Sequence, residues 1–149
     1  MLNPIHKKIY QKIKKYDTIV IARHIGPDPD AVTTQIALRD SIKATFPKKN
    51  VYAVGQSVAR FKTYGSLDKI NEDELGEALL IVVDVPNIYR IDGATFSKYK
   101  EVIKIDHHPF EDKMGELEIV DTTSCSAAQL VTELIFNTKL ELTVPVAEN

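Results

Sequence analysis

Acidic residues and histidines gather at three places along this chain, each directly after a run of apolar residues. They are His24, Asp28 and Asp30 in the first place, Asp84 in the second, and Asp106, His107 and His108 in the third. Of the chain's four histidines, only His6 lies elsewhere. Imidazole and carboxylate groups without thiolates suit a borderline-hard divalent cation such as Mn²⁺, with Mg²⁺, Co²⁺ or Zn²⁺ as alternatives.

Such a gathering of carboxylates needs a compensating charge. Carboxylates held close together raise one another's pKa values and destabilise the fold unless a cation neutralises them. Two divalent ions about 4 Å apart activate water near neutral pH and hold phosphoryl oxygens during an in-line displacement. The residue types therefore predict metal-assisted hydrolysis of a phosphate ester.

The spacing within the groups supports a shared site. A Gly-Pro turn separates His24 from Asp28, so both can face one ion. Asp28 and Asp30 flank Pro29, and in extended backbone their side chains would point the same way. Asp84 stands alone at the end of an apolar run, and we expect it to bridge two ions.

Alternating strands and helices are expected to position these residues. We predict strands at 18–22, 51–54, 79–83, 101–105 and 117–120, a short strand near 61–64, and helices from residue 4, at 31–45 and at 124–136. Asn3 is the expected N-cap of the first helix. This order is typical of parallel βαβ units and predicts an α/β three-layer sandwich, a mainly parallel sheet flanked by helices. Ligands of such sheets bind at the carboxyl ends of the strands, where the three groups lie.

The bulk composition limits the function classes. The 149 residues fit one domain, and the net charge of −2 gives no general attraction for nucleic acid, so a polyanion must be bound locally. One cysteine, Cys125, cannot form an internal disulfide and suits a reducing cytosol. No apolar run approaches the ~20 residues of a membrane span. We expect a soluble cytoplasmic domain that does not enter a membrane, and leave a homodimer open.

The three groups resemble the first three motifs of the DHH phosphoesterase superfamily. The matching segments are His24-x-x-Pro27-Asp28-x-Asp30-Ala31, Asp84 after an apolar strand, and Asp106-His107-His108. The superfamily includes RecJ-type exonucleases, family II inorganic pyrophosphatases and nanoRNase/pAp phosphatases. The residues of these motifs, together with Pro109-Phe110 and the later Ser124-Cys-Ser-Ala-Ala, are most similar to those of the last group.

The resemblance implies a role for each residue. It implies two Mn²⁺ ions held by His24, Asp28, Asp30, Asp84 and His107, with Asp84 bridging. His108 would face the substrate phosphate or tune the site, and Asp106 would orient the histidines. The implied activity removes mononucleotides from very short oligoribonucleotides and the 3′-phosphate from 3′-phosphoadenosine 5′-phosphate (pAp). Small nucleotides and short oligoribonucleotides are thus the expected partners.

The chain departs from the family pattern in three ways. Pro29 stands where glycine is common, which stiffens the loop. A further metal-binding aspartate, in a segment of the type Gly-x-x-x-Asp-Thr, is missing, because Asp121 follows His107 too closely. The glycine-rich second domain is missing too. We therefore interpret 1–149 as the N-terminal DHH domain of a longer enzyme, ending before the last metal motif, with 144–149 as the start of another helix.

Structural explanations compete with the functional ones. Asp28 and Asp30 could cap the following helix, and Asp84 and Asp106 could be ordinary turn residues. We expect Asp121 or Ser124 to cap the last helix, with a phosphate at that N-terminus as the alternative, and expect Cys125 to be buried. Four cationic residues, Arg60, Lys62, Arg90 and Lys104, either steer phosphate or are solvated.

Other functions are also considered. One alternative keeps the chemistry and changes the substrate to pApA or cyclic di-AMP. Another makes the 149-residue chain a catalytically silent module that binds metal or nucleotide, because the downstream aspartate is missing. An inorganic pyrophosphatase is less consistent with the residues of the motifs, which are more similar to those of the nucleotide-cleaving group.

Overall fold

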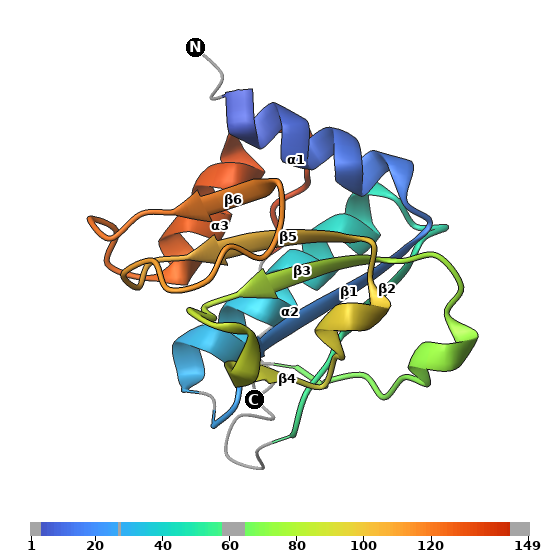
Figure 1. Cartoon of the computed structure of the whole chain (residues 1–149). Helices are drawn as coiled ribbons and strands as arrows, with labels where there is room; N and C mark the ends of the chain where they lie inside the picture. Colours follow the sequence, from blue (N-terminus) through green and yellow to red (C-terminus); the bar gives the residue numbers. More distant parts are fainter. Residues whose placement is uncertain (1–3, 27, 58–64, 144–149) are drawn as a thin grey trace.

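A mainly parallel sheet forms the centre of the molecule. The computed structural model describes residues 4–26, 28–57 and 65–143. Within them the strands are β1 (Thr18–His24), β2 (Asn50–Ala53), β3 (Leu79–Val83), β4 (Ile91–Asp92), β5 (Glu101–Asp106) and β6 (Leu117–Val120). The order is β2-β1-β3-β5-β6, all parallel, and β4 pairs antiparallel with the end of β1. The strand arrows of β3, β5 and β6 in Figure 1 therefore point to one common edge.

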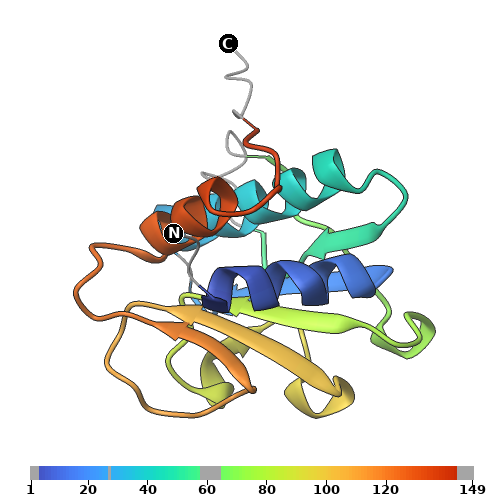
Figure 2. The same ribbon diagram turned by 90° about the horizontal axis from the view of Figure 1, so that it is seen from above.

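Three α-helices cover one face of this sheet (Figure 2). They are α1 (Pro4–Lys15), α2 (Pro29–Thr45) and α3 (Ala127–Phe136). Alternate strand residues, such as Ile19, Ile81 and Ile103, pack with all three helices in one buried cluster. Side chains of a strand alternate between faces, so the remaining strand residues must be covered from the other side.

Short 3-10 helices form the layer on the opposite face. They are η2 (Glu72–Glu74), η3 (Ile88–Arg90) and η4 (Phe96–Lys98). Ile88 and Phe96 from these turns pack against Val20, Leu80 and Val82. Burial on both faces explains why the strands read as continuous apolar runs. The predicted fold class is confirmed.

Most strand and helix boundaries agree with the prediction, and the differences have local causes. The strands expected at 79–83 and 117–120 have those bounds, and 51–54 is shifted by one residue. The strands expected at 18–22 and 101–105 continue to His24 and Asp106, because these residues still pair with Ile91 and Val120. The helix expected at 31–45 begins at Pro29. The two-residue β4 was not predicted.

The start of α3 corrects two predictions. The helix begins at Ala127 rather than Ser124, and its N-cap is Ser126, whose Oγ accepts from the N–H of Gln129 at 3.2 Å. The carboxylate of Asp121 instead accepts from the N–H and O–H of Thr123 in a local turn. Asp121 and Ser124 are therefore not the cap.

Some predictions concern residues outside those described. These are the N-cap Asn3, the strand near 61–64, the cations Arg60 and Lys62, and the helix start at 144–149. Among the described residues, Cys125 is exposed, so the prediction that it is buried is wrong. No described helix has both the length and the apolar character needed to cross a membrane.

Candidate metal centre

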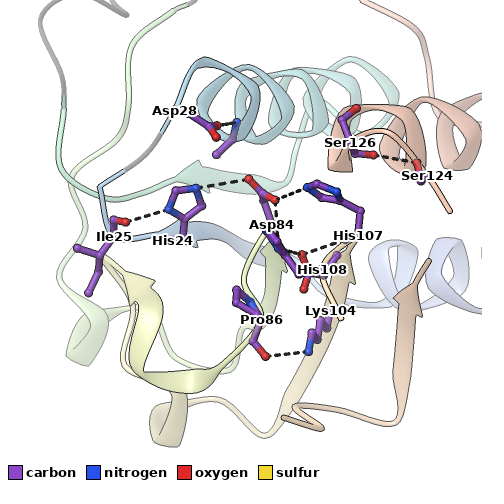
Figure 3. A network of polar contacts seen from close by, with 12 residues as sticks. His24, Ile25, Asp28, Asp84, Pro86, Lys104, His107, His108, Ser124 and Ser126 are labelled. Atoms are coloured by element: carbon purple, nitrogen blue, oxygen red, sulfur yellow. Dashed lines mark hydrogen bonds and ion pairs between the residues drawn. The ribbon is translucent and has the colours of Figure 1, made fainter. Parts of the chain in front are cut away.

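The three predicted groups of acidic residues and histidines meet at the common edge of the sheet. β1, β3 and β5 are adjacent and parallel, so their carboxyl ends lie side by side. His24 ends β1, Asp84 follows β3, and His107 follows β5. In Figure 3 the side chains of all three point toward one another, with Asp84 in the middle.

Asp84 is the centre of this arrangement. One carboxylate oxygen, Oδ2, lies 3.4 Å from Nε2 of His24, and the other, Oδ1, lies 3.1 Å from Nε2 of His107. The residue is 2% exposed, and Oδ1 has no hydrogen-bond partner among the described residues. Its backbone φ of 60° falls in the left-handed region, which residues other than glycine seldom adopt. A buried carboxylate on strained backbone, with an oxygen that accepts no hydrogen bond, is a common feature of functional sites.

The geometry contains two potential ligand groups that share Asp84. The first is His24, Asp28 and Asp84, and the second is Asp84, His107 and His108; within each group the ligand atoms lie within 4.8 Å of one another. A carboxylate common to two groups can place one oxygen on each of two cations. Asp30 belongs to neither group in this conformation.

The hydrogen bond of His24 turns its second ring nitrogen toward Asp84 and leaves that nitrogen able to bind a cation. Nδ1 of His24 lies 2.8 Å from the carbonyl oxygen of Ile25, which can only accept, so Nδ1 carries the proton. In the neutral ring Nε2 then presents a lone pair toward the carboxylate of Asp84. Two electron-rich atoms that face each other repel unless a proton or a metal cation lies between them, and a backbone carbonyl on the far nitrogen is a common partner of metal-binding histidines.

Asp106 contacts both members of the histidine pair. The residue is fully buried, and its Oδ1 accepts from the backbone N–H of His107 at 2.9 Å. The same oxygen lies 2.6 Å from Nδ1 of His108. This contact fixes the ring of His108 and leaves its Nε2 available. The contacts agree with an orienting role for Asp106, which stays a prediction.

Burial makes the site electrostatically unfavourable without a cation. Burial is the main cause that raises the pKa of the Asp84 carboxyl, and the carboxylate of Asp28 adds to it, whereas His108, His24 and His107 oppose the shift. Burial and Asp28 likewise raise the pKa of the Asp30 carboxyl. A bound divalent ion would reverse this cost, because it stabilises the charged form of each carboxylate.

The two aspartates of the first motif lie in different backbone conformations. Asp28 is extended and is the N-cap of α2, where its Oδ1 accepts from the N–H of Ala31 at 2.9 Å. Asp30 lies in the first turn of α2, so the expectation that both share an extended segment is wrong. Backbone N–H groups of Ala127 and Ala128, at the start of α3, oppose only in part the rise in the pKa of Asp30 that burial and Asp28 cause. Asp28 thus caps α2 through Oδ1 and also belongs to the first ligand group.

Two buried cations lie near the site: Arg23, which the sequence analysis did not single out, and Lys104, which it expected to steer phosphate or to be solvated. Arg23 is fully buried, and its Nη1 lies 2.6 Å from Oδ2 of Asp92 in β4, which pairs with the end of β1. Lys104 is fully buried as well, so neither surface solvation nor phosphate steering describes it. Arg90 is exposed. A charged residue within a run that reads as a strand buried on both faces is the signal that could have identified Arg23 and Lys104.

A family model and curated relatives agree on the family to which this chain is similar. Residues 18–148 match the model of the DHH family, N-terminal domain. The probable bifunctional oligoribonuclease and PAP phosphatase NrnA of Streptococcus mutans is 40% identical over 136 residues, which cover 91% of this chain and 44% of that protein. The curated relatives that it matches are covered over 40% to 49% of their length, so the chain spans less than half of each.

Two solved structures share the fold. An exopolyphosphatase-related protein from Bacteroides fragilis superposes with a TM-score of 0.74 at 23% identity, covering 91% of this chain and 44% of that one. The exonuclease RecJ bound to manganese superposes with a TM-score of 0.54 at 15% identity, covering 92% and 37%. At these identities the likeness concerns the fold alone.

Proposed function

Because the chain belongs to the DHH family, we propose that it is the metal-binding domain of a manganese-dependent phosphoesterase acting on very short oligoribonucleotides and on pAp. The observation that carries the proposal is the buried carboxylate of Asp84, shared by ligand groups from three strand ends. The substrates are inferred from the name of the Streptococcus mutans relative, an oligoribonuclease and PAP phosphatase. The proposal concerns the whole enzyme, since the chain spans less than half of that relative.

The residues present suit two divalent cations. We assign His24, Asp28 and Asp84 to one ion and Asp84 and His107 to the other. Asp30, which lies in neither group here, is added to the second ion because of its place in the first DHH motif. The Oδ1 of Asp84, which accepts no hydrogen bond, and the second ring nitrogen of His24, which faces Asp84, support the roles of these two residues. Mn²⁺ suits the mixture of imidazole and carboxylate, and the structurally similar RecJ is bound to manganese; Mg²⁺ and Co²⁺ are alternatives. When bound, such a pair supplies Lewis acidity toward water and toward the phosphoryl oxygens.

His108 is proposed to contact the substrate phosphate. Its side chain is 38% exposed, so a ligand can reach it, and Asp106 holds its Nδ1. In the protonated ring Nε2 would donate a hydrogen bond to a phosphoryl oxygen, while the carboxylate of Asp106 stabilises the imidazolium. This division leaves Asp106 without contact to the substrate.

The test is an assay of the longer protein that carries this domain, with pAp and with a ribodinucleotide, in Mn²⁺ and in chelator. We expect hydrolysis of both substrates only with metal, and a loss of at least about 100-fold in Asp84→Asn. Asp17→Asn is a matched control, because Asp17 is exposed. Failure of the wild-type enzyme to hydrolyse either substrate in any divalent metal would overturn the proposal.

A neighbouring candidate is hydrolysis of pApA or cyclic di-AMP by the same site. The metal ligands and His108 would act in the same way, because the reacting group is again a phosphate ester. A panel of pAp, dinucleotides, pApA and cyclic di-AMP, compared by kcat/KM, separates these substrates. The cytoplasmic location and the homodimer stay predictions.

A further inference from the structure

A buried lysine lies beside the metal centre without belonging to it. Lys104 is the fourth residue of β5, and it is fully buried. It pairs with Val82 of β3, two residues before Asp84. In Figure 3 its side chain extends from β5 to the loop that follows Asp84. An ammonium group so deeply buried must be compensated by nearby acceptors.

The ammonium of Lys104 binds two loops rather than a carboxylate. Its Nζ donates to the carbonyl oxygen of Asp112 at 2.8 Å and to that of Pro86 at 3.2 Å. It also lies 5.1 Å from the centre of the Phe110 ring, a cation–π distance. Among the described residues, no carboxylate lies within ion-pair distance of it. Pro86 follows Asp84 by two residues, and Phe110 and Asp112 follow His108 by two and four.

Further hydrogen bonds join the same two loops. The N–H of Asp112 donates to the carbonyl oxygen of Pro86 at 3.3 Å. The carboxylate of Asp112 accepts from the N–H of Ile88, which begins η3, at 3.0 Å. Residues 84–88 and 107–112 are thus connected to each other, and both are attached to the sheet through Lys104. We call this arrangement the Lys104 clamp.

We propose that Lys104 is a positioning residue for the metal centre, which holds the loops carrying Asp84 and His107 at the separation that two bridged cations require. This inference rests on the proposed function. Asp84 needs such support, because its left-handed backbone is strained and a rotation there would swing its carboxylate away from His24 and His107. Loss of groups that orient metal ligands commonly weakens metal binding about 10–100-fold.

The experiment compares Lys104→Met with Lys100→Met in the 149-residue chain. Methionine keeps the length and apolar stem of lysine but removes the donors, and Lys100 is an exposed lysine just before β5. The first measurement is hydrogen exchange of the Ile88 and Asp112 amides without metal, with the Ile81 amide of β3 as reference. The second is Mn²⁺ binding, followed by electron paramagnetic resonance.

In Lys104→Met we expect faster exchange at Ile88 and Asp112 but not at Ile81, and Mn²⁺ binding weakened about 10-fold; Lys100→Met should behave as wild type. Unchanged exchange in the two loops would overturn the clamp. Equal acceleration at Ile81 would show a general loss of stability instead. Faster loop exchange with unchanged Mn²⁺ binding would overturn the positioning role. If the wild-type chain binds no Mn²⁺, the proposed metal centre fails, and the exchange data still decide the clamp.

Discussion

At the scale of single residues, Asp84 combines several unfavourable features. It is buried, its backbone is left-handed, and burial raises the pKa of its carboxyl. Each feature destabilises the fold without a cation, and a residue chosen for stability alone would be asparagine or glycine. The carboxylate is therefore explained by binding rather than by folding.

Substitution of Asp84 tests whether this carboxylate destabilises the fold when no cation is bound. In chelator we expect Asp84→Asn to be more stable than wild type by about 1 kcal/mol, because it removes a buried charge and keeps the shape of the side chain. Added Mn²⁺ should stabilise the wild type and leave the variant unchanged. Urea unfolding with and without metal measures both effects. A variant less stable than wild type in chelator would contradict the account of Asp84.

His6 predicts a pH dependence that does not involve the metal centre. It is 4% exposed in α1, and its Nδ1 accepts from Nδ2 of Asn137 at 3.1 Å. Burial lowers its pKa below the ordinary 6.5, opposed in part by Glu133. The folded state then binds a proton at His6 less readily than the unfolded state does. The contribution of neutral His6 to the free energy of unfolding is therefore fully present above pH 6.5 and is lost as the pH falls below it.

The variant His6→Gln isolates this contribution, because glutamine is neutral and can still accept from Asn137. The free energy of unfolding should fall more for wild type than for His6→Gln between about pH 8 and about pH 5.5. Urea titrations in chelator at the two pH values measure the difference. Equal losses in both proteins would show that His6 is protonated alike in the folded and unfolded states.

At the scale of elements, the end of β1 depends on a strand of two residues. β4 pairs with Arg23 and His24, and the Arg23–Asp92 ion pair joins the two strands. A second contact links Arg23 to the carbonyl oxygen of Gln56, after β2. These contacts hold the backbone on which the His24 imidazole is mounted.

A glycine beside β4 tests this support. Gly93 has a φ of +84°, and a Cβ there would lie 2.5 Å from the backbone nitrogen of Gly55. We expect Gly93→Ala to lower the free energy of unfolding by more than about 2 kcal/mol and to weaken Mn²⁺ binding. Gly76→Ala is the matched control: its φ is +70° with nothing within 4 Å, so about 1 kcal/mol is expected. Equal losses in the two variants would contradict the close approach at Gly93.

The elements visible in the sequence are those whose patterns are local. Apolar runs such as Leu79–Val83 mark strands buried on both faces, and parallel order brings their carboxyl ends together. The start of α3 was misplaced because Ser124 and Ser126 are both good caps, and only the fold selects Ser126. β4 exists only through its pairing with β1, and the ammonium of Lys104 binds loop carbonyl oxygens, so no local pattern indicates β4 or the partners of Lys104.

At the scale of the whole molecule, the described residues divide structural and functional tasks between parts of one sheet. The helices pack on one face, 3-10 turns cover the other, and the candidate ligands lie at the edge where β1, β3 and β5 end. A substrate would meet this edge without crossing the core. Because this chain matches less than half the length of the Streptococcus mutans relative, we propose that the rest of the longer protein sets the substrate specificity.

Activity should therefore depend on more than this chain. We expect the 149-residue chain to bind Mn²⁺ weakly and to hydrolyse pAp at least about 100-fold more slowly than the longer enzyme, because the second proposed ion has only Asp30, Asp84 and His107 as ligands here. Parallel assays at equal concentration measure the ratio. Robust metal-dependent hydrolysis by the chain, after removal of contaminating nucleases, would contradict this expectation.

Anomalous diffraction at the manganese edge, from crystals of this chain soaked in Mn²⁺, tests the central claim most directly. We predict a Mn²⁺ ion coordinated by His24, Asp28 and Asp84, and density for a second, weaker ion between Asp84 and His107. Absence of manganese at Asp84, or side chains of His24, Asp84 and His107 too far apart to share ions, would contradict the account.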